Sequence, residues 1–130
     1  MKLTDSHCHL YYEPMLNNYK ELIKNCRKKG INKLLTIGVN LETSILNSKL
    51  SVKYKEIYAT VGLHPNNIDE IFNDEDYKGL INKNRKIIGI GETGLDYYRT
   101  KTKLDIQRKN FINHIILSKK CNLPLIVHTR

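Results

Sequence analysis

Apolar residues follow two different rhythms along this chain of 130 residues. Short runs that are apolar at most positions alternate with longer stretches in which apolar residues recur every three or four positions. The short runs predict strands buried on both faces, and the longer stretches predict helices with one buried stripe. Strands are expected at residues 33–39, 57–63, 86–92 and 125–128, and helices at residues 17–29, 42–53, 66–84 and 103–121. Residues 5–9 are polar and are expected to form a first strand on account of their alternating histidines.

The same spacing predicts which side of each helix is buried. The expected stripes are Tyr19, Leu22, Ile23 and Cys26 in the first helix, Ile45, Leu46 and Leu50 in the second, and Leu104, Phe111, Ile112, Ile115 and Ile116 in the last. His114 falls at the edge of the last stripe and is interpreted as a surface histidine. The acidic residues within 66–84 are interpreted as a solvated helix face.

Strands separated by single helices are typical of β/α units with a parallel sheet. Two α/β architectures fit this order: an open doubly wound sheet and a (β/α)8 TIM-type barrel. A dinucleotide-binding sheet would need a Gly-x-Gly-x-x-Gly turn after its first strand, and this sequence has none there. The polar residues gather instead at the carboxyl ends of the strands, where β/α barrels build their active sites. We therefore expect residues 1–130 to form about five barrel-type units of one domain.

Four of the expected strands end in histidine or glutamate. They supply His7 and His9, His64, Glu92 and His128. Alternate side chains of an extended strand share a face, so Asp5 is expected to project together with His7 and His9. Two imidazoles on one face form half of a metal site, because neutral imidazole suits zinc and several other divalent ions.

Alternation makes a similar prediction for the later strands. Ile88, Ile90 and Glu92 share one parity, as do Ile126 and His128. Apolar packing is therefore expected to give way to a metal-binding side chain at the rim of each strand. Cys8 has the opposite parity to its neighbouring histidines, so it is expected to pack toward the helices.

Composition adds constraints on partners and location. The 22 Lys and Arg against 13 Asp and Glu give a formal charge of +9, which is typical of a protein that meets a polyanion such as nucleic acid. The basic residues are spread over both halves, so compositional drift explains the charge equally well. The three cysteines are too widely spaced for a disulfide framework and fit a reducing compartment. Without a signal peptide or an apolar run of the roughly 20 residues that a membrane helix needs, the sequence predicts a cytoplasmic protein.

Four segments resemble successive blocks of the TatD-type metal-dependent deoxyribonucleases, a branch of the amidohydrolase-like barrels. They are Asp5-Ser6-His7-Cys8-His9-Leu10, Val61-Gly62-Leu63-His64-Pro65, Gly89-Ile90-Gly91-Glu92-Thr93-Gly94-Leu95-Asp96-Tyr97-Tyr98 and Pro124-Leu125-Ile126-Val127-His128-Thr129-Arg130. The resemblance implies that His7 and His9 bind one divalent ion and that His128 binds a second. It implies that Glu92 is catalytic and binds between or beside the two ions.

The resemblance also implies roles around these ligands. His64 and Arg130 are expected near the substrate phosphate, although a strand-end histidine and a solvated arginine explain them as well. Asp5 is expected either beside the histidines or beneath the metal, where it would anchor a ring nitrogen. Asp96 is expected to order the loop after Glu92 behind the ligands, and a plain turn role fits it equally.

A TatD-type chain would hydrolyse phosphodiester bonds in DNA, from an end of the strand, with two divalent ions. Two ions can generate the nucleophile and stabilise the leaving oxygen, and magnesium, manganese and zinc all accept such ligands. Two other functions stay open. One is a related barrel enzyme that cleaves a C–N or ester bond in a small molecule. The other is a non-catalytic, basic nucleic-acid-binding module, although the clustered basic and aromatic residues of such modules are missing from this sequence.

The number of strands sets one further expectation. A barrel of this type has eight strands and about 250 residues, and five strands cannot close it. The family also has a histidine after its sixth strand and an aspartate after its seventh, and both positions fall beyond residue 130. We therefore expect an N-terminal fragment or a truncated gene product that forms an open half-barrel with unpaired edge strands. Little nuclease activity is expected from these residues alone.

Overall fold

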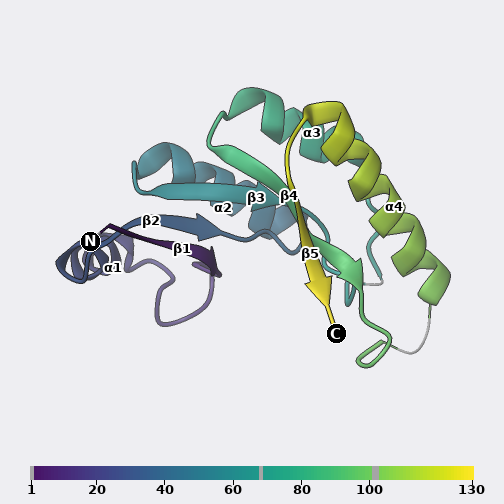
Figure 1. The fold of residues 1–130 in the computed structure, drawn as a ribbon, viewed down its shortest axis with the longest axis horizontal. Coiled ribbons are helices and arrows are strands. Elements are labelled where there is room, and N and C mark those ends of the chain that lie inside the picture. The colour runs from purple at the N-terminus through teal and green to yellow at the C-terminus, as the bar shows by residue number, and fades with distance from the viewer. Residues whose placement is uncertain (1, 68, 101–102) are drawn as a thin grey trace.

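The computed structural model describes residues 2–67, 69–100 and 103–130. Its centre is a five-stranded sheet in the order β1-β2-β3-β4-β5, and every neighbouring pair is parallel. The strands are β1 (Leu3–Cys8), β2 (Ile31–Thr36), β3 (Ile57–Val61), β4 (Ile87–Leu95) and β5 (Leu125–Thr129). The sheet curls so that β1 and β5 form its two edges, which is the open half-barrel that the alternation of strands and helices predicted (Figure 1).

The helices lie on the outside of the curl (Figure 1). They are α1 (Tyr19–Lys28), α2 (Leu41–Lys53), α3 (Asp74–Lys83) and α4 (Leu104–Cys121). The predicted helix at residues 66–84 is helical only within α3, and Ile68 lies outside the described residues. In the part of the chain that the structure describes, no helix is both long enough and apolar enough to cross a bilayer.

The core is divided into two apolar clusters between the sheet and the helices. One cluster lies under α1 and α2 and is centred on Leu34, Leu50 and Ile57. The other lies under α3 and α4 and is centred on Val61 and Ile90, together with Leu117. The concave side of the sheet carries instead an open groove, which is lined by Thr4, Ser6, Lys33, Leu35, Tyr58 and Ile88.

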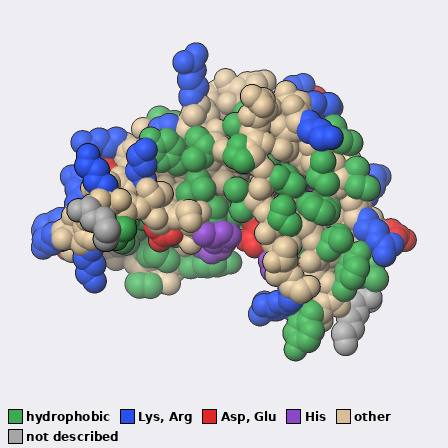
Figure 2. All heavy atoms as spheres, in the orientation of Figure 1, with side chains coloured by type: hydrophobic (Ala, Val, Ile, Leu, Met, Phe, Trp, Pro, Cys, Tyr) green, Lys and Arg blue, Asp and Glu red, His purple; other side chains and the backbone are tan. Residues whose placement is uncertain are grey.

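The predicted stripe of α4 is wrong. Ile112 and Ile116 are 55% and 43% exposed, and apolar side chains are visible over this part of the surface in Figure 2. The buried residues of α4 are Gln107, Asn110, His114 and Leu117. His114, interpreted from the sequence as a surface residue, has no exposed area. Polar side chains can occupy a core when each polar atom has a partner, and hydropathy does not record such partners.

Helix α2 also departs from its predicted stripe. Its buried residues are Ser44, Asn47, Leu50 and Ser51, whereas Ile45 is 37% exposed. The hydroxyl of Ser44 accepts a hydrogen bond from the Gly62 backbone N–H at 3.2 Å, and the Asn47 carbonyl oxygen accepts one from the Thr36 hydroxyl at 2.9 Å. Small polar side chains therefore bring this helix close to the strands, and its isoleucine faces outward.

The predicted parity of β4 is also wrong. Ile88 faces the concave groove and is 38% exposed, whereas Ile90 is fully buried against the helices. The pairing with β3 moves from Ala59 and Ile87 directly to Thr60 and Gly89, so one residue of β4 has no counterpart. Such a bulge exchanges the two faces of a strand, and period-two counting cannot detect it.

A similar register shift in β1 separates Asp5 from the neighbouring histidines. Asp5 pairs with Leu34, which packs against the helices, and the pairing shifts before Cys8. Asp5 therefore lies on the helix side and does not share a face with His7 and His9 as the alternation predicted. Burial, and after it the charge of Asp5, raises the pKa of the Cys8 thiol to about 12. Cys8 packs against the apolar cluster under α1 and α2, on the side that its parity predicted.

Candidate metal centre

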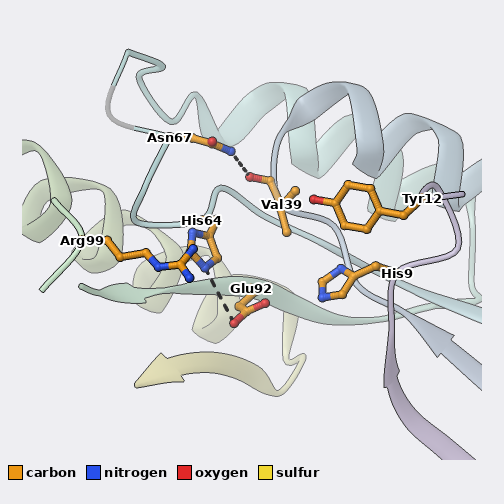
Figure 3. A pocket seen from close by; sticks show the side chains of 7 residues that line it. All are labelled: His9, Tyr12, Val39, His64, Asn67, Glu92 and Arg99. Carbon is orange, nitrogen blue, oxygen red and sulfur yellow. Dashed lines mark hydrogen bonds and ion pairs between the residues drawn. The ribbon is translucent and has the colours of Figure 1, made fainter. Parts of the chain in front are cut away.

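The carboxyl ends of the strands surround a cleft of about 240 Å³. The side chains that line it are His9, Tyr12, Val39, His64, Asn67, Glu92 and Arg99 (Figure 3). The sequence predicted His9, His64 and Glu92 for this end of the sheet, and it missed the loop residues Tyr12, Asn67 and Arg99. Figure 2 shows histidine and acidic side chains meeting where the two ends of the curled sheet face each other.

Close backbone approach brings two of these strand ends together. A Cβ atom on Gly62, directly after β3, would lie 2.5 Å from the Cα of Gly91 in β4, so only glycine fits at this point. Gly91 itself has a φ of 128°, in the region that side chains rarely adopt. His64 and Glu92 follow these glycines, and they face each other across the cleft at 3.9 Å between Nε2 and Oε1.

Glu92 lies at the centre of the arrangement. Its Oε2 is 3.5 Å from Nε2 of His7, and its Oε1 is 3.0 Å from Nδ1 of His128. Its backbone N–H donates to the Gly38 carbonyl at 2.8 Å, which fixes this end of β4 against the segment after β2. The carboxylate is 9% exposed, and its two oxygens point toward two different groups of histidines.

Among the residues that the structure describes, two groups of side chains have ligand atoms within 4.8 Å of one another, and Glu92 belongs to both. The first group is His7, His9 and Glu92, and the second is His64, Glu92 and His128. The His7 and His9 rings are 5.2 Å apart and nearly perpendicular. The structure thus brings together all the residues that the sequence assigned to metal binding, although the register shift in β1 was not foreseen.

His9 is held from behind by a tyrosine that sequence reasoning missed. The Tyr11 hydroxyl lies 2.6 Å from Nδ1 of His9. The other ring nitrogen, Nε2, takes no part in this contact. Burial, and after it the neighbouring charge of His7, lowers the pKa of His9, so its ring favours the neutral form that a metal requires. Tyr11 stands two residues after the His-x-His pattern, but nothing in the sequence indicates that its side chain contacts the His9 ring.

His128 is oriented by Asp96, which is fully buried. Asp96 Oδ2 lies 3.1 Å from Nε2 of His128, and Oδ1 accepts hydrogen bonds from the backbone N–H groups of Tyr98 and Arg99. The hydrogen bond from Arg99 is the main reason why the pKa of Asp96 falls to about 2. Asp96 is therefore a carboxylate that only accepts, and Nε2 of His128 carries the proton that it accepts.

It follows that Nδ1 of neutral His128 has no proton and offers a lone pair. This lone pair lies 3.0 Å from the Glu92 carboxylate oxygen Oε1, which is also an acceptor. Two acceptors at hydrogen-bonding distance repel each other unless a proton or a cation lies between them. The Asp96, His128 and Glu92 arrangement is that of a metal ligand whose second ring nitrogen is fixed by a carboxylate.

His64 has the opposite arrangement. Its Nδ1 accepts a hydrogen bond from the Asn66 backbone N–H at 3.1 Å, so in the neutral ring the proton is on Nε2. Burial lowers the pKa of His64 and favours this neutral form. The Nε2–H group lies 3.2 Å from Nδ1 of His128, so His64 enters the cleft as a hydrogen-bond donor and not as a metal ligand.

The remaining predicted residues lie outside the cleft lining. The Asp5 carboxylate accepts from the backbone N–H of His7 at 3.1 Å, so this bond anchors the strand and not an imidazole ring. Arg130 is exposed, and its guanidinium lies 5.8 Å from the centre of the Tyr98 ring. Arg99 supplies the cationic side chain of the cleft. Arg99 belongs to a loop, and strand patterning does not predict where loop side chains point.

The donor set suits a divalent metal. It combines neutral imidazoles from β1 and β5 with the Glu92 carboxylate, and such mixed ligands accept zinc, manganese and magnesium to differing degrees. His7, His9 and Glu92 could hold one ion, and Glu92 with Nδ1 of His128 could contribute to a second.

Comparison with known proteins gives consistent matches. The family model described as "TatD related DNase" matches residues 4–130. An uncharacterized metal-dependent hydrolase of Bacillus subtilis, YabD, is 34% identical over 98% of this chain and 51% of its own length. YcfH of Escherichia coli K12, described in the same words, is 31% identical over all of this chain and 50% of its own. The chain thus spans about half the length of the curated relatives that it matches.

Solved structures show the same relation. YJJV of Escherichia coli, a TatD homolog, superposes with a TM-score of 0.91 at 24% identity, covering 98% of this chain and 51% of that one. An uncharacterized amidohydrolase from Saccharomyces cerevisiae superposes with a TM-score of 0.76 at 22% identity, covering all of this chain and 48% of that one. At these identities the likeness establishes the fold, in which the present chain corresponds to about half of each solved chain.

Proposed function

The chain belongs to the family of TatD-related DNases, and from that premise we propose that it carries the metal-binding half of a hydrolase acting on phosphodiester bonds in DNA. The observation that supports metal binding is the pair of acceptors at its centre, Nδ1 of His128 and Oε1 of Glu92, which lie 3.0 Å apart. Asp96 holds the His128 proton on the other nitrogen, so a cation removes the repulsion between these two acceptors.

In this proposal the residues divide into three roles. His7 and His9 bind one ion, His128 binds a second, and Glu92 contributes one oxygen to each. His64 donates its Nε2–H to an oxygen of the scissile phosphate, and Arg99 lies on the same cleft wall to meet the phosphate charge. Arg130 stands at the outer edge of the site, where it adds to the positive field that attracts a polyanion.

The chemistry explains why these residue types are needed. Divalent ions supply a nucleophile from water at neutral pH and compensate charge on the leaving oxygen. The side chains would hold the ions and the phosphate in place. Glu92 would bind ions with its carboxylate, Asp96 keeps His128 in one tautomer, and His64 points a donor into the cleft. A cleft of about 240 Å³ that is open at the rim fits the end of a DNA strand, and we propose attack from an end.

The chain offers four of the metal ligands that this family is expected to use. A closed barrel places further ligands on strands beyond the fifth, and those strands are not among these 130 residues. We therefore propose that the 130 residues bind divalent ions and DNA but hydrolyse DNA poorly without the complementary half of the barrel.

The test compares this chain with a chimera in which it is joined to the second half of a full-length relative. The chimera should hydrolyse single-stranded DNA in the presence of Mn²⁺, and chelation or the substitution His7→Ala should abolish this activity. The isolated chain should show little turnover. Turnover by the isolated chain at the rate of a full-length relative would contradict the division of the site between two halves.

The same experiment separates the alternatives that the sequence left open. A cyclic amide offered beside the DNA would be the better substrate if the site acts on small-molecule C–N bonds. A non-catalytic DNA-binding module would bind DNA with a strong dependence on salt, and this binding would persist after chelation and in Glu92→Ala.

A further inference from the structure

The buried face of α4 is polar, and each of its polar side chains contacts a different segment of the rim. Gln107 is 1% exposed, Asn110 is 7% exposed and His114 is fully buried. Asn110 shows the pattern most simply: its oxygen accepts from the Phe72 backbone N–H at 3.2 Å, and its Nδ2 donates to the Glu70 carbonyl at 3.4 Å. One face of one helix therefore holds loop backbone by both its donors and its acceptors.

Gln107 fixes the segment that carries Asp96. Its Oε1 accepts a hydrogen bond from the Asp96 backbone N–H at 2.9 Å, and its Nε2 donates to the Asp96 carbonyl at 3.3 Å. Both backbone groups of Asp96 are thus held by one side chain of α4. Because the Asp96 carboxylate orients His128, the orientation of that ring depends indirectly on Gln107.

His114 fixes the segment that carries His64. Its Nδ1 lies 2.6 Å from the Asn110 carbonyl and must donate to it, and its Nε2 accepts from the Leu63 backbone N–H at 2.9 Å. Both ring nitrogens are satisfied in the neutral ring, and burial lowers the pKa of His114 to about 4. The ring of Phe72 packs against His114 at 3.7 Å between centroids and limits its rotation.

The two attachments meet in the cleft. Leu63, which His114 holds, directly precedes His64, and Asp96, which Gln107 holds, contacts His128. Helix α4 therefore fixes the neighbour of each histidine without contacting the histidines themselves. The His64 Nε2 and His128 Nδ1 atoms are 3.2 Å apart. We propose that Gln107 and His114 are positioning residues, which set the separation of the His64 donor and the His128 ligand without touching ion or substrate. The proposal rests on the function proposed above for His64 and His128.

The test uses His114→Leu, which keeps a similar volume but removes the acceptor for Leu63. His114→Gln is the rescue variant, because its side-chain oxygen can accept from the same N–H. Leu117→Ala is the matched control: Leu117 is buried on the same face of α4 and contacts the apolar cluster, so its loss weakens packing alone. All variants of the full 130-residue chain are compared at a temperature at which circular dichroism shows each to be folded.

Long-range ¹H–¹⁵N spectra of the imidazole rings are measured first, without metal. In the wild type they should show His64 protonated on Nε2, and they give the reference signals of the His128 ring. His114→Leu should shift the signals of both rings, His114→Gln should return them to the wild-type positions, and Leu117→Ala should leave them in place. Unchanged rings in His114→Leu would overturn the proposal, since the residue would then only stabilise the fold.

Titration with Mn²⁺ is the second readout. Gln107→Leu removes both hydrogen bonds to the Asp96 backbone and should weaken Mn²⁺ binding about tenfold, in the range seen for residues that orient metal ligands. His114→Leu acts on a donor and not on a ligand, so it should weaken Mn²⁺ binding less. Equal affinity in the wild type and Gln107→Leu would count against the proposal even if the rings move. If the wild type binds no divalent ion, the proposed function fails, and the ring spectra alone decide whether α4 positions the histidines.

Discussion

The two ends of the same parallel strands are both polar, but their polar groups are arranged in opposite ways. At the amino ends, the Lys86 ammonium donates to the carbonyls of Ser51 and Tyr54, each at 2.6 Å, and the Arg27 guanidinium pairs with the Glu56 carboxylate. At the carboxyl ends, by contrast, Nδ1 of His128 faces the Glu92 carboxylate, and both are acceptors.

The difference separates polar residues that stabilise the fold from those that bind a ligand. Where each donor meets an acceptor, the network needs nothing further and contributes to stability. Where acceptors converge, their repulsion is removed only when a proton or a cation lies between them, so such a network stabilises the fold less and leaves a place for a ligand. The division matches the expectation that the carboxyl face of a β/α barrel carries function and the amino face carries stability.

The largest expected effect separates the two ends by metal affinity. Replacing the central carboxylate in Glu92→Gln should weaken Mn²⁺ binding by more than about 100-fold, because changes behind a ligand already cost 10- to 100-fold. The free energy of unfolding should stay constant or rise, since the repulsion between Glu92 and His128 is removed. Calorimetric titration and thermal unfolding measure the two quantities. Glu56→Gln is the control at the amino end, and an equal loss of affinity there would remove the distinction.

The next effect concerns the residue behind the rim. Asp96→Asn should weaken Mn²⁺ binding about 30-fold, because an amide does not hold the His128 proton on Nε2 as a carboxylate does. Its Oδ1 can still accept from Tyr98 and Arg99, so the turn is retained. The imidazole spectrum of His128 should show a mixture of tautomers. A single unchanged tautomer of His128, together with wild-type Mn²⁺ affinity, would mean that Asp96 only stabilises the turn that follows it.

These contrasts also explain how far the sequence could be interpreted. The five strands, the half-barrel and the family were predicted and are confirmed, because strands and helices alternate regularly along the sequence and the matching blocks are long. The predicted helix faces failed at α4, where Gln107 and His114 are buried and hydrogen-bonded through both polar atoms of each side chain. Hydropathy assigns such residues to the surface because it cannot count partners that are distant in sequence.

The sequence predicted which residues form the candidate site, but it did not predict which of their atoms donate or accept hydrogen bonds. His7, His9, Glu92 and His128 do come together, as strand ends on one edge must. Whether a histidine offers a lone pair or a proton depends on a partner elsewhere, such as the Asn66 N–H for His64. The face of Asp5 depended on a bulge, and a bulge leaves no period in the sequence.

A third experiment sharpens the comparison from the amino end. Lys86→Met should lower the free energy of unfolding by about 1.5 kcal/mol, because it leaves two partly buried carbonyls without their charged donor. Mn²⁺ affinity should not change. Chemical denaturation gives the stability, and Lys119→Met, at an exposed lysine of α4, controls for the loss of a positive charge. A fall in Mn²⁺ affinity in Lys86→Met would show that the two ends are coupled.

The smallest effect is a pH dependence that belongs to the amino end alone. Burial disfavours the ionised form of Glu56, but the hydrogen bond from Arg27 and the charges of Arg27 and Lys55 outweigh it and lower the pKa of Glu56. A carboxylate with a lowered pKa in the folded state stabilises the fold above its unfolded pKa of about 4.3, and this stabilisation is lost as the pH falls through the folded value.

Because the Arg27 side chain is half exposed, the pair should contribute no more than about 1 kcal/mol. The wild type and Glu56→Gln should therefore differ by about that much in denaturation at pH 7, and the difference should vanish as the pH falls below about 4. A difference that persists unchanged in acid would mean that Glu56 stabilises by packing and neutral hydrogen bonds. Charge pairing would then not be what distinguishes the amino ends of the strands from the converging acceptors at their carboxyl ends.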